Sequence, residues 1–346
     1  MGRRILVTGL STYWGGRLAQ ALESDPTVDV VVGLDTREPS VRLERTEYVR
    51  TDESYSILAR IVRATKVDTV LHTFLVVDSG APEARRMHEI NVIGTMNLCA
   101  AVQAGGSTVR TVVVKSSTHV YGSQPEDPSF FAEGTPRSRP ARIRLERSLL
   151  EVEQYVHDLA IDHPAMAVAV LRFVNVVGPD VRTSLVRLLD APLVPAIVGF
   201  DPRFQLVHED DVVRALQFAM EQRLSGTFNV AGSTPIPWSE ILRVSGKPVF
   251  PLSPVATAAG TRLLRALGGP DVTPELQQLL RYGRGIDNRR LREAGFEYLY
   301  DTPGALADHV EASRLRRTVG QARPDYAFEP EVEEFFRRSR AVVTDG

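Results

Sequence analysis

The chain has 346 residues, of which 43% are hydrophobic and 24% charged, and its formal net charge is −2. This balance is typical of a globular protein of about two domains, and it excludes a strong electrostatic field for nucleic acid or an anionic membrane. The apolar runs are shorter than the ~18 residues of a membrane span, and the N-terminal run is too short for a signal peptide. We therefore expect a cytoplasmic protein that binds neither nucleic acid nor membrane.

The single cysteine, Cys99, cannot form an internal disulfide, which favours a reducing compartment. We interpret Cys99 as a small apolar helix residue.

The first local signal is an apolar run that ends at a glycine. The residues from Arg4 to Thr8 predict a strand, Gly9 predicts a tight turn, and the pattern that resumes at Gly15 predicts a helix. The N–H groups and the dipole at such a helix N-terminus favour an anion, typically a dinucleotide pyrophosphate. The spacing does not match G-x-G-x-x-G, so an ordinary strand-to-helix connection stays an alternative.

A second buried strand is predicted at 29–35, and it ends in a carboxylate. Asp35 lies 20 residues after Gly15, where an acid accepts hydrogen bonds from the adenosine ribose and repels a 2′-phosphate. This position favours NAD over NADP, although the guanidinium of Arg37 could bind a phosphate. An aspartate in a surface turn is the alternative interpretation of Asp35.

Strands and helices continue to alternate along the chain. Helices are predicted at 56–64 and 84–104, and strands at 67–72 and 111–117. This alternation indicates βαβ units, a parallel sheet and a doubly wound α/β fold. Ligands of such sheets bind beyond the carboxyl ends of the strands, where Gly9, Asp35, His72 and Ser117 all fall.

Further segments carry short motifs in a fixed order. They are Asp52 after Val49-Arg-Thr, His72–Leu75, Asn91–Thr95 (N-V-I-G-T), Ser116–Gly122 (S-S-T-H-V-Y-G), Leu171–Pro179, His208–Val212 and Gly226–Gly232. With the first turn, they resemble the landmarks of extended short-chain dehydrogenases/reductases, in particular NAD-dependent epimerases and dehydratases similar to UDP-glucose 4-epimerase. The resemblance covers about residues 4 to 310. Its first turn departs from T-G-x-x-G-x-x-G at Thr12, which replaces the middle glycine and would either crowd the ligand or offer it a hydroxyl.

The resemblance implies a Rossmann-type doubly wound parallel sheet with a smaller C-terminal substrate lobe. The dinucleotide-binding domain would span 1–178 and regain 206–232, and the substrate lobe would consist of 179–205 and 233–310. The remaining 311–346 would form a helical extension, including a solvated helix at 329–340. Family members are often dimers through helices of the nucleotide domain, so we expect a homodimer.

The resemblance also implies NAD as the cofactor, with NADP less favoured, and a nucleotide sugar or another small molecule as the substrate. The expected cofactor-binding residues are Gly9, Thr12, Tyr13, Trp14, Gly15, Asp35, Arg37, Asp52, Thr73, Phe74, Asn91, Ser116 and Phe173. Arg172 and Asn175 would contact the substrate, although Asn175 alternatively only closes a turn.

The family's acid–base pair is missing from this chain. Relatives carry Tyr-x-x-x-Lys on a helix beside the nicotinamide, where the ammonium lowers the pKa of the tyrosine. Here Leu145 and Leu149 occupy these positions, and no Tyr or Lys occurs between Ser123 and Gln154. Ser117 matches the family's strand-end hydroxyl.

His119 is the candidate replacement for the missing acid–base pair. It would point to the same side as Ser117 if the strand continued, and its ordinary pKa of about 6.5 suits proton transfer. A turn or surface histidine is the alternative.

Other polar residues have structural interpretations. His72 would lie near the cofactor or be a satisfied buried histidine, and Tyr121 belongs to the V-Y-G landmark. His208 with Asp210 and Asp211 superficially resembles a metal site but matches a family landmark, so no metal is expected.

Two functions stay open: an atypical nucleotide-sugar epimerase or oxidoreductase, and a catalytically inactive nucleotide-binding sensor or scaffold.

Overall fold

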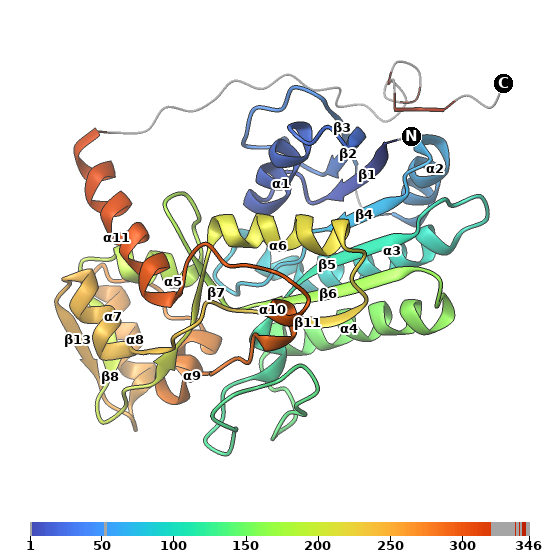
Figure 1. Cartoon of the computed structure of the whole chain (residues 1–346). Coiled ribbons are helices and arrows are strands. Elements are labelled where there is room, and N and C mark those ends of the chain that lie inside the picture. The colour runs from blue at the N-terminus through green and yellow to red at the C-terminus, as the bar shows by residue number, and fades with distance from the viewer. Residues whose placement is uncertain (1, 52–53, 320–335, 337–338, 340, 344–346) are drawn as a thin grey trace.

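A seven-stranded parallel sheet forms the centre of the molecule in this computed structural model, which describes residues 2–51, 54–319, 336, 339 and 341–343 (Figure 1). The strand order is β11-β6-β5-β4-β1-β2-β3. The strands are β1 (Arg3–Thr8), β2 (Val28–Asp35), β3 (Thr46–Arg50), β4 (Thr69–His72), β5 (Thr111–Ser117), β6 (Ala167–Phe173) and β11 (Gly226–Val230). The inner strands are runs of buried Val, Ile and Leu because helices cover both faces. The structure confirms the predicted doubly wound sheet.

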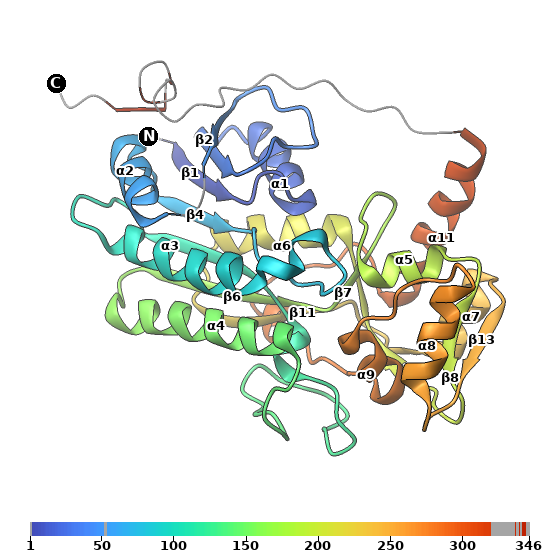
Figure 2. The same cartoon turned by 180° about the vertical axis from the view of Figure 1, so that it is seen from behind.

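Helices form one layer on each face of the sheet (Figures 1 and 2). One layer contains α1 (Tyr13–Glu23) and α6 (Glu209–Glu221), and the other contains α2 (Tyr55–Thr65), α3 (Gly94–Gln103) and α4 (Arg144–Asp162). Each helix packs through apolar residues at helical spacing, as in α2, where Leu58, Ile61, Val62 and Thr65 are buried. This sandwich leaves the carboxyl edge of the sheet open for loops.

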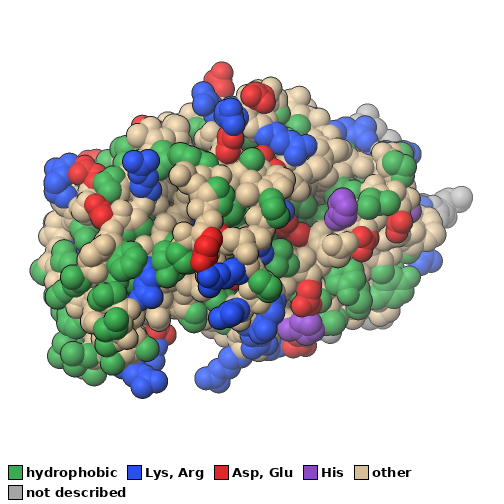
Figure 3. All heavy atoms as spheres, turned by 90° about the horizontal axis from the view of Figure 1, so that it is seen from below, with side chains coloured by type: hydrophobic (Ala, Val, Ile, Leu, Met, Phe, Trp, Pro, Cys, Tyr) green, Lys and Arg blue, Asp and Glu red, His purple; other side chains and the backbone are tan. Residues whose placement is uncertain are grey.

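A smaller lobe lies beyond that carboxyl edge. It consists of α5 (Ser184–Asp190), β8 (Val194–Ile197), β9 (Arg203–Phe204), β12 (Ile236–Pro237), α7 (Trp238–Ser245), β13 (Val249–Leu252), α8 (Thr257–Ala266) and α9 (Pro274–Tyr282). Its core includes the fully buried Trp238, whose indole N–H donates to the carbonyl of Pro195. Seen from below, hydrophobic side chains gather at the end of the molecule where this lobe lies (Figure 3).

The remaining elements connect the lobe to the sheet. They are β7 (Asn175–Val177), which pairs with β10 (Leu206–His208), and the helices α10 (Arg289–Glu293) and α11 (Thr302–Val319). The segment between β10 and β11 returns to the sheet layer, since β11 pairs with β6. None of the helices in the described part of the chain combines the length and apolar content needed to cross a bilayer.

Three local features differ from the sequence predictions. Edge strand β3 was not predicted, because Thr46-Glu-Tyr-Val-Arg50 is half exposed and lacks a long apolar run. The predicted helix at 84–104 consists of a 3₁₀ helix, η1 (Pro82–Arg86), a π-helical turn, η2 (Glu89–Ile93), and α3. Asp52 and most of the predicted helix at 329–340 lie outside the described residues.

Candidate functional site

The first turn requires glycine at two positions. Gly9 has φ +77°, and a Cβ there would lie 2.5 Å from the Cα of Phe74. A Cβ on Gly15 would lie 2.2 Å from the carbonyl oxygen of Gly9. Both contacts are shorter than real Cβ contacts, so the strand, the turn and the start of α1 pack this closely only with glycines.

Thr12 caps helix α1. Its Oγ1 donates to the carbonyl of Gly9 at 2.7 Å and accepts from the backbone N–H of Gly15 at 3.1 Å. The hydroxyl is therefore engaged within the loop, as a helix N-cap. Among the described residues, the backbone N–H groups of Tyr13 and Trp14 donate to no protein acceptor. They are the first-turn donors that an anion would use.

Asp35 fixes the same turn from the end of β2. Its carboxylate accepts backbone N–H bonds from Ser11 at 2.9 Å, Thr36 at 2.7 Å and Arg37 at 3.3 Å, and the residue is only 7% exposed. The guanidinium of Arg37 pairs with the carboxylate of Glu83 at 2.5 Å. In this pair the carboxylate offsets the charge of Arg37, which would otherwise favour the binding of a 2′-phosphate here.

A cleft of about 780 Å³ runs along the carboxyl edge of the sheet. The predicted cofactor residues that line it are Thr12, Tyr13, Trp14, Asp35, Arg37, Thr73 and Phe74. Four further arginines border it, at positions 85, 86, 182 and 187. The cleft therefore combines a helix N-terminus, a buried carboxylate and cationic walls in one elongated space.

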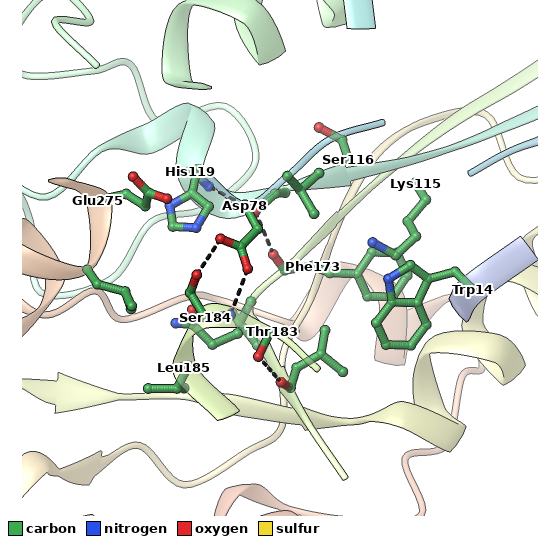
Figure 4. Close-up of a pocket in the computed structure, with 16 residues that line it drawn as sticks. Trp14, Asp78, Lys115, Ser116, His119, Phe173, Thr183, Ser184, Leu185 and Glu275 are labelled. Atoms are coloured by element: carbon green, nitrogen blue, oxygen red, sulfur yellow. Dashed lines mark hydrogen bonds between the residues drawn. The ribbon is translucent and has the colours of Figure 1, made fainter. Parts of the chain in front are cut away.

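A second, smaller pocket adjoins this cleft (Figure 4). Trp14, Val77, Asp78 and Thr183 line both spaces. The predicted residues Ser116, Ser117, His119, Phe173 and Asn175 line the smaller pocket. Its free volume is about 60 Å³, and the side chains of Trp14 and Phe173 are among those that line it.

His119 reaches this pocket from a turn. Strand β5 ends at Ser117, and a 3₁₀ helix, η3 (Thr118–Tyr121), follows, so the expected strand continuation is absent. Ser117 Oγ donates to the Phe173 carbonyl and accepts from the backbone N–H of His119, both at 3.3 Å. Burial, assisted by the positive charge of Arg284, lowers the pKa of His119 to about 3. Its ring is neutral at pH 7, and Nδ1 has no hydrogen-bond partner in the described part of the chain.

Other predicted residues lie elsewhere. Arg172 points to the opposite face of β6, where its guanidinium binds the Glu153 carboxylate at 2.6 Å, and it does not line the pocket. Neighbouring side chains alternate across a strand, so Phe173 faces the pocket and Arg172 does not. Ser116 Oγ also donates to Glu153, at 2.6 Å. Asn91 is buried beneath the cleft, where its side chain exchanges two hydrogen bonds with the backbone of Val76.

The two histidines with open interpretations are satisfied structurally. His72 is fully buried, and its ring nitrogens contact the hydroxyls of Thr8 and Thr95, both at 2.9 Å. Burial lowers the pKa of His72 to about 3. His208 accepts from the backbone N–H of Asp210 at the start of α6, and its Nε2 lies 3.0 Å from the Asp308 carboxylate.

Leu145 and Leu149 belong to the hydrophobic core, each with 0% exposure on helix α4. Three charged pocket residues escaped sequence reasoning: Lys115, Asp78 and Glu275. Only Lys115 carried a signal, since the chain has three lysines against 38 arginines. Asp78 and Glu275 lie in segments without a motif, and only the fold brings them to the pocket.

Comparison with known proteins places the chain in a family. A sequence model of the NAD dependent epimerase/dehydratase family matches residues 5–231, which is more than half of the chain. The protein belongs to the NAD dependent epimerase/dehydratase family. This epimerase/dehydratase family member is 36% identical to an uncharacterized protein of Mycobacterium tuberculosis, over 92% of this chain and 88% of the relative. It is also 30% identical to UDP-glucose 4-epimerase of Yersinia pestis, over 50% of this chain and 53% of that enzyme.

Solved structures share the fold of this epimerase/dehydratase family member. MoeE5 in complex with UDP-glucuronic acid and NAD superposes with a TM-score of 0.69 and 22% identity, covering 90% of this chain and 99% of MoeE5. UDP-glucuronic acid 4-epimerase from Bacillus cereus, in complex with NAD, gives a TM-score of 0.66 and 16% identity, covering 90% and 99%. At these identities the likeness concerns the fold alone.

Proposed function

We propose that the protein binds NAD across the carboxyl edge of the sheet. MoeE5 and the Bacillus cereus epimerase, which share the fold, are both found in complex with NAD. The observation that carries this proposal is the pairing of the Gly9 turn with the buried carboxylate of Asp35. The free N–H groups of Tyr13 and Trp14 would hold the pyrophosphate. Asp35 would accept hydrogen bonds from the adenosine ribose.

The sheet order supports one direction for the dinucleotide. Strands β2 and β3 lie on one side of β1, so the adenosine half would extend over them toward Asp35. The other half would then cross β4 toward β5, where the smaller pocket lies. When bound there, NAD would supply a hydride acceptor next to Ser117. Family membership and this direction together support a nucleotide sugar as the substrate, with the smaller lobe holding its nucleotide part.

The residues of the pocket limit the chemistry that we propose. His119, with a pKa of about 3, is a weak proton acceptor at pH 7, and its Nδ1 is better suited to accept a hydrogen bond from a substrate hydroxyl. Ser117 and Asn175 would orient the substrate. We therefore propose an atypical oxidoreductase or epimerase site that lacks the family's Tyr-x-x-x-Lys pair.

A second candidate is a nucleotide-binding sensor without catalysis. The complete burial of Leu145 and Leu149 favours it, because apolar packing would then occupy the positions where the resemblance expects the acid–base pair. Loss of such a group lowers rates by about 10²–10⁴. The expected homodimer and the division into 1–178, 206–232 and the two lobe segments stay predictions in either case.

Calorimetric titration with NAD and NADP tests the proposed binding. We expect NAD to bind more tightly than NADP in the wild type. Asp35→Asn should reduce the NAD-over-NADP preference by about tenfold, or about 1.4 kcal/mol, because the amide no longer repels a 2′-phosphate. Asp162→Asn, at the exposed end of α4, is the matched control that should leave both affinities unchanged. Absence of heat with either dinucleotide at millimolar concentration would contradict the proposal.

Turnover separates the two candidate functions. The wild type and Ser117→Ala should be incubated with a panel of nucleotide sugars, and the cofactor absorbance and sugar products followed. Turnover that Ser117→Ala abolishes would support the oxidoreductase. Binding of NAD without any turnover would support the sensor.

A further inference from the structure

Lys115 is a buried amine at the end of β5. It is 3% exposed, and its Nζ lies 4.8 Å from the ring centroid of Trp14 and 5.5 Å from that of Phe173. Among the described residues, it makes no hydrogen bond and no ion pair. Figure 4 shows the amine above the two rings at the mouth of the smaller pocket. A buried charge without a carboxylate is costly, so a lysine here calls for a functional explanation.

Most charged groups around Lys115 are engaged with other partners. In the pocket, Asp78 binds the hydroxyl and backbone N–H of Ser184. Glu275 accepts from the backbone of Ser79 through Oε1, and its Oε2 has no hydrogen-bond partner and no ion pair with Lys115 in the described part of the chain. On α6, Glu209 accepts from Asp180 and Val181, Asp210 pairs with Arg17, and Asp211 pairs with Arg214. His72 on β4 and His119 on η3 are neutral at pH 7 because burial lowers the pKa of each to about 3.

Two further charged groups, Arg172 on β6 and Glu153 on α4, lie on the other face of the sheet from Lys115. They pair with each other there, on the side that Ser116 faces. Side chains alternate along β5, so Lys115 faces the opposite side with Ser117. The charge of Lys115 therefore has no local counterion on its own side.

Lys115 lies on β5, the strand that the nicotinamide half of the dinucleotide would approach. This step rests on the proposed NAD binding, in which Asp35 takes the adenosine half and the nicotinamide half extends toward Ser117. The pocket beside Lys115 has a free volume of about 60 Å³, room for about two water molecules. A nicotinamide ring that reaches this pocket would lie beside the Lys115 amine, because Lys115 is one of the residues that line it.

We propose that Lys115 is a specificity residue for the redox state of the cofactor: its ammonium favours the uncharged reduced nicotinamide over the positively charged oxidised ring. Two positive charges at short range in a buried pocket repel strongly, whereas the reduced ring carries no charge. The preference depends on protonation. Burial lowers the pKa of Lys115 to about 7, so the amine is charged in mildly acidic solution and neutral in mildly alkaline solution.

Arginine would not serve this purpose, because its guanidinium stays charged at all relevant pH values. The chain otherwise uses arginine for 38 of its 41 basic residues, yet it carries lysine at this buried position. A titratable cation at the cofactor site makes the NADH preference strong at low pH and weak at high pH.

The test measures dissociation constants for NADH, NAD⁺ and ADP-ribose at about pH 6 and about pH 8.5, on either side of the pKa. ADP-ribose lacks the nicotinamide ring and reports on the rest of the site. Energy transfer from the Trp14 indole to the reduced ring, measured in a Trp238→Phe background, reports that the ring reaches the pocket. The variants are Lys115→Met, which removes the charge at similar length, and Lys247→Met as a control in the smaller lobe, whose Nζ donates to the carbonyl of Asp190.

We expect the wild type at about pH 6 to favour NADH over NAD⁺ by at least ~10-fold more than Lys115→Met does, given a charge repulsion in a partly buried site. At about pH 8.5 the wild-type ratio should approach that of Lys115→Met. ADP-ribose affinity should be the same in both proteins, and Lys247→Met should behave as the wild type.

Equal NADH-to-NAD⁺ ratios in the wild type and Lys115→Met at both pH values would overturn the proposal. A change in ADP-ribose affinity as large as the change in NAD⁺ affinity would also overturn it, since Lys115 would then act on the whole site. If Lys115→Met does not fold, a wild-type ratio that stays constant with pH is the overturning result. Failure of all three ligands to bind would instead overturn the proposed NAD binding.

Discussion

At the scale of single residues, Leu149 stands where the family resemblance places the lysine of the Tyr-x-x-x-Lys pair. Its side chain is fully buried on α4 and packs with Leu145 into the core beneath the pocket. A lysine that contacts a cofactor must reach an accessible space, whereas this leucine contributes only to packing. At this position the side chain therefore contributes to stability.

Leu149→Ala should lower the free energy of unfolding by about 3 kcal/mol, because it removes buried methyl groups and leaves a cavity. Urea unfolding followed by circular dichroism measures this change. Leu263→Ala on α8 is the matched control, since Leu263 is 54% exposed and its loss should cost less than about 0.5 kcal/mol. Equal losses in the two variants would show that Leu149 is not a core residue.

At the scale of an element, the turn and helix α1 act as one unit. Thr12 ends the turn and caps the helix, and Asp35 holds the turn from the neighbouring strand. Thr12 replaces the family's middle glycine at a position where the hydroxyl satisfies an N–H group within the loop. The substitution therefore stabilises the loop without removing the donors of Tyr13 and Trp14.

Thr12→Ala should lower the free energy of unfolding by about 1 kcal/mol, because the N–H of Gly15 loses its side-chain acceptor. Thr12→Ser retains the capping oxygen and should stay within about 0.5 kcal/mol of the wild type. Thermal and urea unfolding of the three proteins provide the comparison. If serine and alanine destabilise the protein to the same extent, the capping bond does not contribute.

At the scale of the whole molecule, two buried histidines connect stability to pH. The pKa values of His72 and His119 are about 3 in the folded state, well below their ordinary value of about 6.5. The unfolded chain therefore binds more protons between these pH values. The contribution of each neutral histidine is complete above about pH 6.5 and is lost as the pH falls toward 3.

We expect each of these histidines to cost about 1.4 kcal/mol of unfolding free energy when the pH is lowered from about 7.5 to about 5.5. His119→Gln should make the pH dependence shallower by that amount. His157→Gln, at an exposed position on α4, should retain the wild-type dependence. Urea unfolding at the two pH values is the measurement, and identical slopes for all three proteins would contradict the assigned burial of His119.

The sequence by itself determined the sheet, the turn at Gly9 and the acid at Asp35. These features depend on local patterns: runs of apolar residues, glycine where a backbone must approach closely, and a carboxylate at a strand end. The same reasoning predicts the role of Ser117 and the missing acid–base pair, because each belongs to a short motif of the resembling family.

Only the tertiary structure decided which side chains meet. It turned Arg172 away from the pocket and toward Glu153, since strand alternation depends on which face each neighbouring layer covers. It brought His119 in from a 3₁₀ turn, and it joined Asp78 and Glu275 to Ser117 from segments far apart in the chain. Above all, it left Lys115 buried without a counterion, because burial and charge pairing are properties of packing that no stretch of sequence carries alone.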